Sequence, residues 1–117
     1  MSESVFTFRT QGGVGVARVT LPEILHPDQL DQMSHQFRVF VGETDLAAYV
    51  LDLSPLDYLT SAAIGMLMNA HAHLEAEGRR FAMVARADLV IETLQHTHLE
   101  KVFPICADIE EALSAIA

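Results

Sequence analysis

The sequence predicts an α/β fold, in which a mixed, mostly parallel sheet of about five strands is flanked by about four helices. Two observations carry this prediction. Strand-like and helix-like segments alternate along most of the chain, which is typical of parallel strands joined by right-handed helical crossovers. The segment Ala47–Leu53 is also almost continuously apolar, which is typical of a central strand buried on both faces.

The chain is predicted to open with a hairpin. One strand-like segment begins at Val5, and a second runs from Val14 to Leu21. Gln11-Gly12-Gly13 between them is typical of a tight turn. The two strands are therefore expected to be antiparallel neighbours at one edge of the sheet.

A connector from Pro22 to Pro27 leads into the first expected helix, which opens at Pro27 or Asp28 because proline is tolerated in the first helical turn. The segment Gly42–Asp45 is expected to end it. Its apolar residues recur at helical spacing, namely Leu30, Met33, Phe37, and Phe40 or Val41.

The second half of the chain continues the alternation. A helix from about Ser61 to Glu77, closed by Gly78, precedes a strand over Arg80–Val84. A third helix is expected from Ala87 to about Gln95. A short last strand is expected to contain Val102, Phe103 and Ile105, and Asp108 is expected to cap a final helix whose apolar side carries Ile109, Ala112, Leu113 and Ile116.

The composition limits the classes of function that the chain can have. The 117 residues fit one domain, 1–117, with half of the residues apolar. The net charge of −9, with seven Lys and Arg, argues against nucleic acid and against anionic lipid as direct partners. No apolar run approaches the about 18 residues of a membrane span, and Met1-Ser2-Glu3-Ser4 does not open a signal peptide. A cytoplasmic protein without membrane insertion is expected.

The chain shows no pattern typical of a metal, cofactor or catalytic site. The spacing in His71-x-His73 and in His96-x-His98 is not the i, i+4 spacing of a helical zinc site, and His71 is expected to be a packed core histidine. The lone Cys106 is expected to be a small buried hydrophobe. We therefore expect no metal, no cofactor and no catalytic residue, and hence a protein that is not an enzyme.

The most informative segment is the run Tyr49–Leu67. An apolar strand ends near Asp52, and Thr60 and Ser61 then open a long helix, where free N–H groups and the helix dipole favour a negative group. Asp52 is expected to order the following loop by accepting backbone N–H groups. Thr60 is expected to be a plain helix cap, whereas Ser61 has two open roles, structural or phosphate-accepting.

This segment resembles the STAS domain, the fold of the bacterial anti-anti-sigma factors. The family typically has a strand ending in Asp-Leu-Ser, then an aromatic and an aliphatic residue, then Asp-Ser-Ser-Gly-Leu. Asp52-Leu53-Ser54, Tyr58-Leu59 and Thr60-Ser61-Ala62-Ala63-Ile64 occupy these places. The resemblance extends over essentially the whole chain, including the tail from Phe103-Pro104-Ile105 to Leu113.

The resemblance also locates the candidate modification site. The serine usually phosphorylated in the family aligns with Ala62, and the Asp and Gly of the pattern are replaced by Thr60 and Ala63. Some stressosome-type relatives carry the acceptor directly after the Asp position, which here is Ser61. Ser61 is thus the first phosphorylation candidate and Thr60 the second, and a member that is not phosphorylated is the alternative.

The resemblance implies a regulatory protein, an anti-sigma factor antagonist. Its partner would be an anti-sigma factor or a related serine kinase, with a phosphatase as a further candidate, and its oligomeric state stays open. A phosphate on Ser61 is expected to release the partner, because burying an unpaired anion is costly. The expected contact residues lie in the loop and helix start at 57–65: Asp57, Tyr58, Thr60, Ser61, Ala62 and Gly65. Met66 and Met68 flank this helix, and at least one of them is expected to fill the core.

Two alternatives remain open. STAS-like domains also serve as small subunits of lipid-transport ATPases, in which the same loop and helix contact the ATPase. Alternatively, the end of the central strand near Asp52 could hold a nucleotide, since ligands bind at the carboxyl ends of strands in open α/β sheets.

Overall fold

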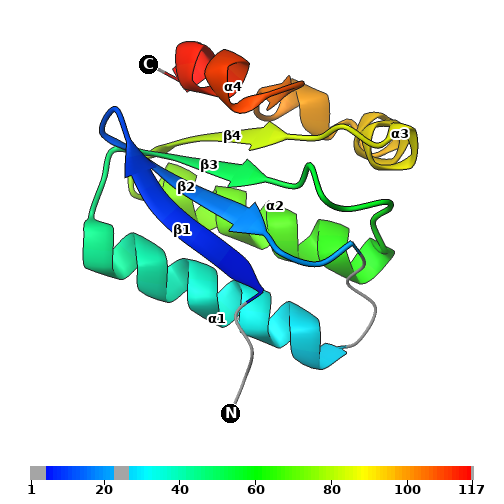
Figure 1. Ribbon diagram of the computed structural model, residues 1–117, viewed down its shortest axis with the longest axis horizontal. Helices are drawn as coiled ribbons and strands as arrows, with labels where there is room; N and C mark the ends of the chain where they lie inside the picture. The colour runs from blue at the N-terminus through cyan, green and yellow to red at the C-terminus, as the bar shows by residue number, and fades with distance from the viewer. Residues whose placement is uncertain (1–4, 23–26, 117) are drawn as a thin grey trace.

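A computed structural model of the protein describes residues 5–22 and 27–116. Within these residues the strands form one sheet in the order β1-β2-β3-β4-β5 (Figure 1). β1 is antiparallel to β2, and every other neighbouring pair is parallel. The α/β fold with a mixed, mostly parallel sheet is confirmed. In chain order the elements are β1 (Phe6–Gln11), β2 (Val14–Val19), α1 (Pro27–Thr44), β3 (Ala48–Asp52), α2 (Ser61–Ala76), β4 (Arg80–Val84), α3 (Asp88–His96), the 3₁₀ helix η1 (Leu99–Lys101), β5 (Ile105–Cys106) and α4 (Ile109–Ile116).

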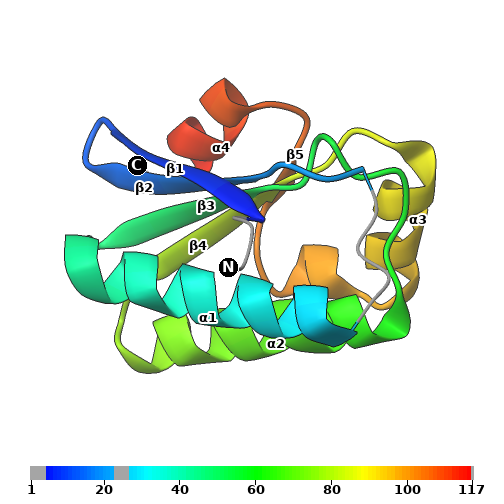
Figure 2. The same ribbon diagram turned by 60° about the horizontal axis from the view of Figure 1, so that its bottom comes forward.

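The sheet lies between two unequal layers of helix. α1 and α2 run along one face, α4 covers the other face, and α3 lies beyond the carboxyl ends of β3 and β4 (Figures 1 and 2). The larger apolar core fills the space under α1 and α2 and includes the completely buried Tyr49, Leu51 and Leu67. A smaller core lies under α4 and includes Val50 and Cys106. Because β3 contributes to both cores, its nearly continuous apolar sequence is explained.

The opening hairpin is confirmed. Gly12 and Gly13 have φ angles of 58° and 79°, and Gln11 pairs with Val14 across the turn. Two consecutive positive φ angles define the turn type whose twist matches paired strands, and glycine adopts them without a steric penalty.

The first helix extends further than its glycine suggests. The expected terminating segment Gly42–Asp45 does contain the helix end, but α1 continues through Gly42 to Thr44. The Thr44 hydroxyl donates to the Phe40 carbonyl at 2.7 Å, and Phe40 and Val41 are buried. This packing outweighs the cost of about 1 kcal/mol for a helical glycine. The chain leaves the helix at Asp45, whose φ is 47°.

The expected last strand is wrong in part. β5 contains Ile105 and Cys106, whereas Val102 and Phe103 lie outside the ladder, between η1 and β5. Phe103 is nevertheless buried, because its ring lies 5.1 Å from the rings of both His71 and Phe81. The apolar character of Phe103 therefore indicated correctly that the residue is buried, but it did not indicate that the residue pairs in a strand.

The remaining boundaries differ from expectation by one or two residues. β1 begins after Val5, β2 ends before Leu21, and α2 ends at Ala76 with Glu77 as its cap. The expected Asp108 cap is confirmed, because Asp108 Oδ1 accepts the Glu111 N–H at 2.8 Å. Residues 1–4 and most of the expected Pro22–Pro27 connector lie outside the described residues.

Candidate functional site

The central strand ends on a buried carboxylate. Asp52 is 1% exposed, and its Oδ1 accepts the Ser54 backbone N–H at 2.9 Å. Its Oδ2 lies 3.7 Å from Nη1 of Arg18, the residue opposite it on β2. A buried charge needs such partners, because leaving it unpaired costs several kcal/mol. The two contacts hold the chain at the point where it leaves β3.

Backbone hydrogen bonds fix the loop that follows. The Leu53 N–H donates to the Val84 carbonyl at 2.8 Å, and the Asp57 N–H donates to the Pro22 carbonyl at 2.9 Å. Leu56 is buried between these two anchor points. The loop is therefore a fixed surface that leaves the Asp57 side chain exposed.

Thr60 is the N-cap of α2. Its hydroxyl oxygen accepts the Ala63 N–H at 3.1 Å, and its carbonyl accepts the Ile64 N–H at 3.1 Å. The expectation that Thr60 caps this helix is confirmed. Ser61 is the first helical residue, and its side chain is exposed, whereas Thr60 and Tyr58 are half-buried.

The exposed face of α2 carries no charge over its first three turns. Met68 is 51% exposed, whereas Met66 packs against the core, as was expected of one of the two. Residues spaced three or four apart share a helix face. The exposed residues on this face are Ser61, Ala62, Gly65, Met68, Asn69 and Ala72. In a chain with a net charge of −9, this set forms an uncharged surface in which all side chains except Met68 and Asn69 are small. We call it the α2 face.

The positive end of α2 is not offset by an acidic side chain. Of the four α-helices in the described part of the chain, the other three each have an acidic residue in the first turn, and α2 has none. No hydrogen bond among the described residues takes up the N–H groups of Ser61 and Ala62. Free N–H groups at a positive helix end attract an anion.

The structure brings most of the expected contact residues to one place. Ser61, Ala62 and Gly65 are exposed on one side of α2, and the exposed Asp57 lies four residues before Ser61. Asn69 and Ala72 extend this surface beyond the expected residues, although helical spacing from Ser61 predicts both. The ion pair between Arg18 and Asp52 could not be predicted from either segment, because only the strand register places the two residues opposite each other.

A separate groove of about 400 Å³ lies at the carboxyl ends of the strands, beside α4. This is where the nucleotide alternative would place its ligand. The charged residues that line it are Arg18, Asp52, Arg86, Asp108 and Glu110. Because its carboxylates outnumber its guanidinium groups, the groove does not favour a polyphosphate.

His71 is half-buried against aromatic rings, as expected of a packed histidine. Its ring lies 5.1 Å from that of Phe103, and its Nε2 lies 2.7 Å from the Glu75 carboxylate. Over residues 5–22 and 27–116, no three His, Cys, Asp or Glu side chains are grouped so that they could hold a metal ion. In the same residues, no helix combines the length and the apolar character that crossing a membrane requires.

A model of the STAS domain matches residues 8–112. An anti-sigma factor antagonist from Mycobacterium paratuberculosis has a similar structure, with a TM-score of 0.82 and 24% identity over 95% of this chain and 92% of that one. A STAS domain protein from Planctomyces limnophilus has a TM-score of 0.80 and 21% identity, over 95% of this chain and 97% of that one. The phosphorylated form of the Bacillus cell fate determinant SpoIIAA has a TM-score of 0.69 and 17% identity, over 96% of this chain and 99% of that one.

Proposed function

The chain belongs to the STAS domain family, and on this premise we propose that it is a non-enzymatic regulatory module that binds an anti-sigma factor or a related serine kinase. The proposed contact surface consists of the Asp57–Gly65 segment and the α2 face. Two of the structural relatives, from Mycobacterium paratuberculosis and Planctomyces limnophilus, are named as anti-sigma factor antagonists. In such a role, the protein would hold its partner and thereby free the partner's target.

The observation that carries this proposal is the neutral α2 face. The charged residues of a −9 chain are absent from the exposed side of α2 between Ser61 and Ala72. Uncharged side chains cost less to remove from water than charged ones, and the cores of protein interfaces are depleted in charged residues. The fixed loop before α2 supports the same role, because a surface that is already ordered loses little entropy on binding.

We further propose that phosphorylation of Ser61 would weaken this contact. A phosphate there adds about −1.5 to −2 charges at pH 7. The positive end of α2, which lacks an acidic first-turn residue, would tolerate it within the free protein. In the complex, the same anion would be buried in a neutral interface, so the partner would be released. Thr60 is the less suitable acceptor, because its hydroxyl oxygen caps the helix.

Binding can be tested by titrating the protein with the anti-sigma factor or switch kinase encoded nearest to its own gene, using calorimetry. The variant Ala62→Arg places a long charged side chain on the α2 face and is expected to weaken binding at least about tenfold. Ala115→Arg is the matched control, because Ala115 is also an exposed helical alanine but lies on α4, across the sheet. The proposed surface would be contradicted if both variants lost the same amount of binding affinity, or if Ala62→Arg lost none.

The phosphorylation proposal has its own test. The protein is incubated with the partner kinase and ATP, and intact mass and peptide mapping locate any added phosphate. Ser61→Ala is expected to abolish the modification, and Ser61→Asp to weaken binding much more than Ser61→Asn does. Phosphate elsewhere than Ser61 or Thr60, or tight binding by Ser61→Asp, would overturn this part. Binding to a transporter ATPase in place of an anti-sigma factor would assign the same surface to the transport alternative.

A further inference from the structure

The first strand leaves one side of the sheet open. β1 is the outermost strand of the sheet that the described residues form, with β2 as its neighbour. The Thr20 N–H donates to the Val5 carbonyl, so Val5 and every second residue after it form the hydrogen-bonded pairs of the ladder. The peptide groups of Phe8 and Thr10 therefore point away from β2, toward the open side. Such an edge is a template for pairing with another strand.

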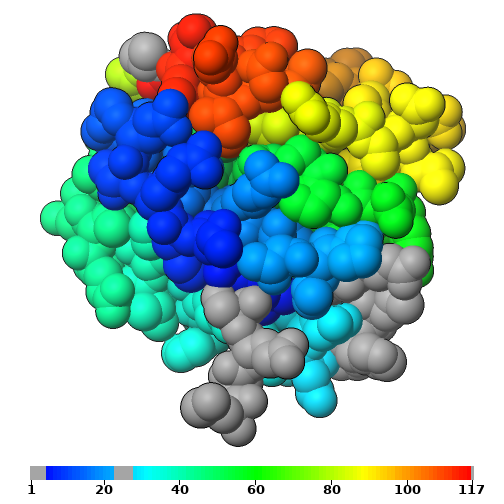
Figure 3. All heavy atoms as spheres, in the orientation of Figure 1, coloured from blue at the N-terminus to red at the C-terminus, as the bar shows by residue number. Residues whose placement is uncertain are grey.

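An apolar groove accompanies this edge. Phe8 is 38% exposed and stacks on Phe40 of α1, with 4.5 Å between the ring centroids. Val39 of α1 is 42% exposed beside it, and the groove measures about 360 Å³. Figure 3 shows the blue atoms of the hairpin lying directly against the green-blue atoms of α1 at this side of the molecule. Two large, partly exposed apolar side chains, Phe8 and Val39, thus line one groove next to the edge strand.

The imidazole and the carboxylate that line the groove are spaced to suit a second copy of the same chain, because an imidazole N–H can donate to a carboxylate. His35 and Glu43 also line the groove, and each lies four residues from Val39 along α1, on opposite sides of it. They are therefore about 12 Å apart on one helix face. If two copies meet about a two-fold axis near Val39, the two α1 helices run antiparallel, and His35 of each lies opposite Glu43 of the other. A two-fold axis is also what antiparallel pairing of β1 with itself requires.

We propose that this chain forms a symmetric homodimer in which β1 and α1 of one copy pair with β1 and α1 of a second copy. Phe8 and Val39 lie nearest the axis, and the two His35–Glu43 contacts flank it. The ten strands of the two sheets then form one continuous sheet, since each contributes five. The α2 face stays free, so the dimer presents two copies of the proposed partner surface.

Sedimentation velocity over about two decades of protein concentration, up to about 100 μM, measures the self-association directly. The unmodified chain is expected to shift from monomer to dimer over this range. Val39→Arg places two guanidinium groups against each other at the axis and is expected to weaken the dimer at least about tenfold. Ala115→Arg on α4 is the matched control and is expected to leave the dimer intact.

A charge exchange keeps the test independent of any folding defect. Glu43→Lys is expected to weaken the dimer, and the double variant His35→Glu, Glu43→Lys to restore it, since the two new residues again face each other across the axis. Hydrogen exchange of the Phe8 amide is expected to slow as concentration rises. The proposal is overturned if the unmodified chain stays monomeric, if Val39→Arg dimerises normally, or if the double variant associates no better than Glu43→Lys alone.

Discussion

The Thr60 hydroxyl accepts the Ala63 N–H at 3.1 Å, whereas the neighbouring Ser61 is exposed at the start of α2. Thr60→Ala removes the acceptor and is expected to lower the free energy of unfolding by about 0.5–2 kcal/mol, measured by urea denaturation. Thr60→Ser keeps the hydroxyl and is expected to cost less than half as much. An alanine variant as stable as the unmodified chain would show that the cap contributes nothing.

The buried carboxylate of Asp52 should matter more than its exposed partner Arg18. Asp52→Ala leaves the Ser54 N–H without its acceptor and is expected to destabilise the fold by about 1–3 kcal/mol, measured by urea denaturation. Asp52→Asn retains an oxygen for Ser54 and is expected to fall between alanine and the unmodified chain. If Asp52→Asn and Asp52→Ala lower the free energy of unfolding equally, the hydrogen bond to Ser54 does not account for the stability that the carboxylate provides.

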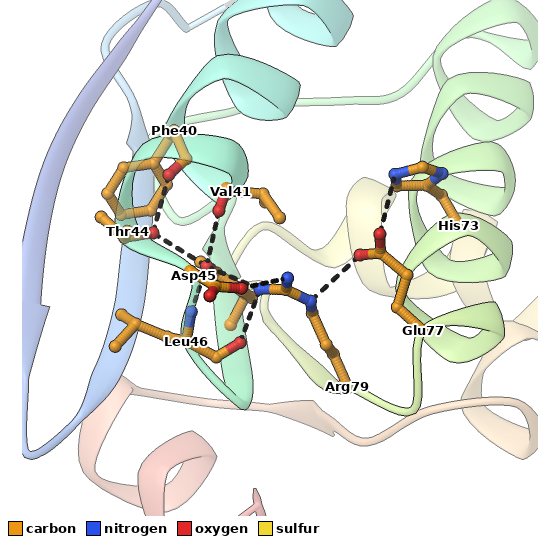
Figure 4. Close-up of polar contacts among 9 residues, drawn as sticks. Phe40, Val41, Thr44, Asp45, Leu46, His73, Glu77 and Arg79 are labelled. Atoms are coloured by element: carbon orange, nitrogen blue, oxygen red, sulfur yellow. Dashed lines mark hydrogen bonds and ion pairs between the residues drawn. The ribbon is translucent and has the colours of Figure 1, made fainter.

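Arg79 joins the loop after α1 to the end of α2, at the other end of the sheet (Figure 4). Its guanidinium donates to the Leu46 carbonyl at 2.8 Å and to Asp45 Oδ1 at 2.6 Å, and its Nε lies 3.0 Å from Glu77 Oε1. A lysine cannot make these contacts together, because it is a single point charge. Arg79→Lys is therefore expected to lower the urea midpoint nearly as much as Arg79→Ala. Full recovery with lysine would show that charge alone is sufficient.

What could be predicted from the sequence was mostly local. The Thr60 and Asp108 caps and the Gly12-Gly13 turn follow from residue type and immediate neighbours, and all three are confirmed. The order of the elements was predictable because the hydrophobic period changes at each boundary. The neutral α2 face was accessible in principle, since it needs only the spacing of one helix.

What could not be predicted depends on residues far apart in the chain. The Arg18–Asp52 ion pair is set by the register of β2 against β3, which neither strand's sequence specifies alone. Phe103 was assigned to a strand because apolar character shows burial and not which partner causes it. The groove beside β1 likewise exists only once α1 has been placed across the hairpin.

Two glycines should respond in opposite ways to alanine. A Cβ on Gly15 would lie 2.6 Å from Cδ1 and Cε1 of the Tyr49 ring, and the Tyr49 hydroxyl is held by the Leu46 N–H at 2.8 Å. The ring is therefore held at one end by its backbone in β3 and at the other by its hydroxyl. Because it cannot easily move aside, Gly15→Ala is expected to destabilise the fold by about 1–3 kcal/mol. A Cβ on Gly42 meets nothing within 4 Å, and Gly42→Ala in helix α1 is expected to stabilise by about 0.5–1 kcal/mol. Thermal unfolding of both variants checks the pair, and an unchanged Gly15→Ala protein would mean that the Tyr49 ring can shift.

The thiol of Cys106 should stay protonated in the folded protein well above neutral pH. Its burial in the core under α4, followed by the charges of Glu111 and Asp108, raises its pKa above the ordinary value of 9.0. Because the folded state then binds the proton more tightly than the unfolded state does, this contribution to stability is complete below about pH 9 and is lost as the pH rises through the folded pKa.

Alkylation of Cys106 by iodoacetamide at neutral pH is expected to be slow in the folded chain and fast in urea. The free energy of unfolding is expected to fall above pH 9 more steeply in the unmodified chain than in Cys106→Ala, and parallel pH curves for the two would show that the thiol titrates alike in both states.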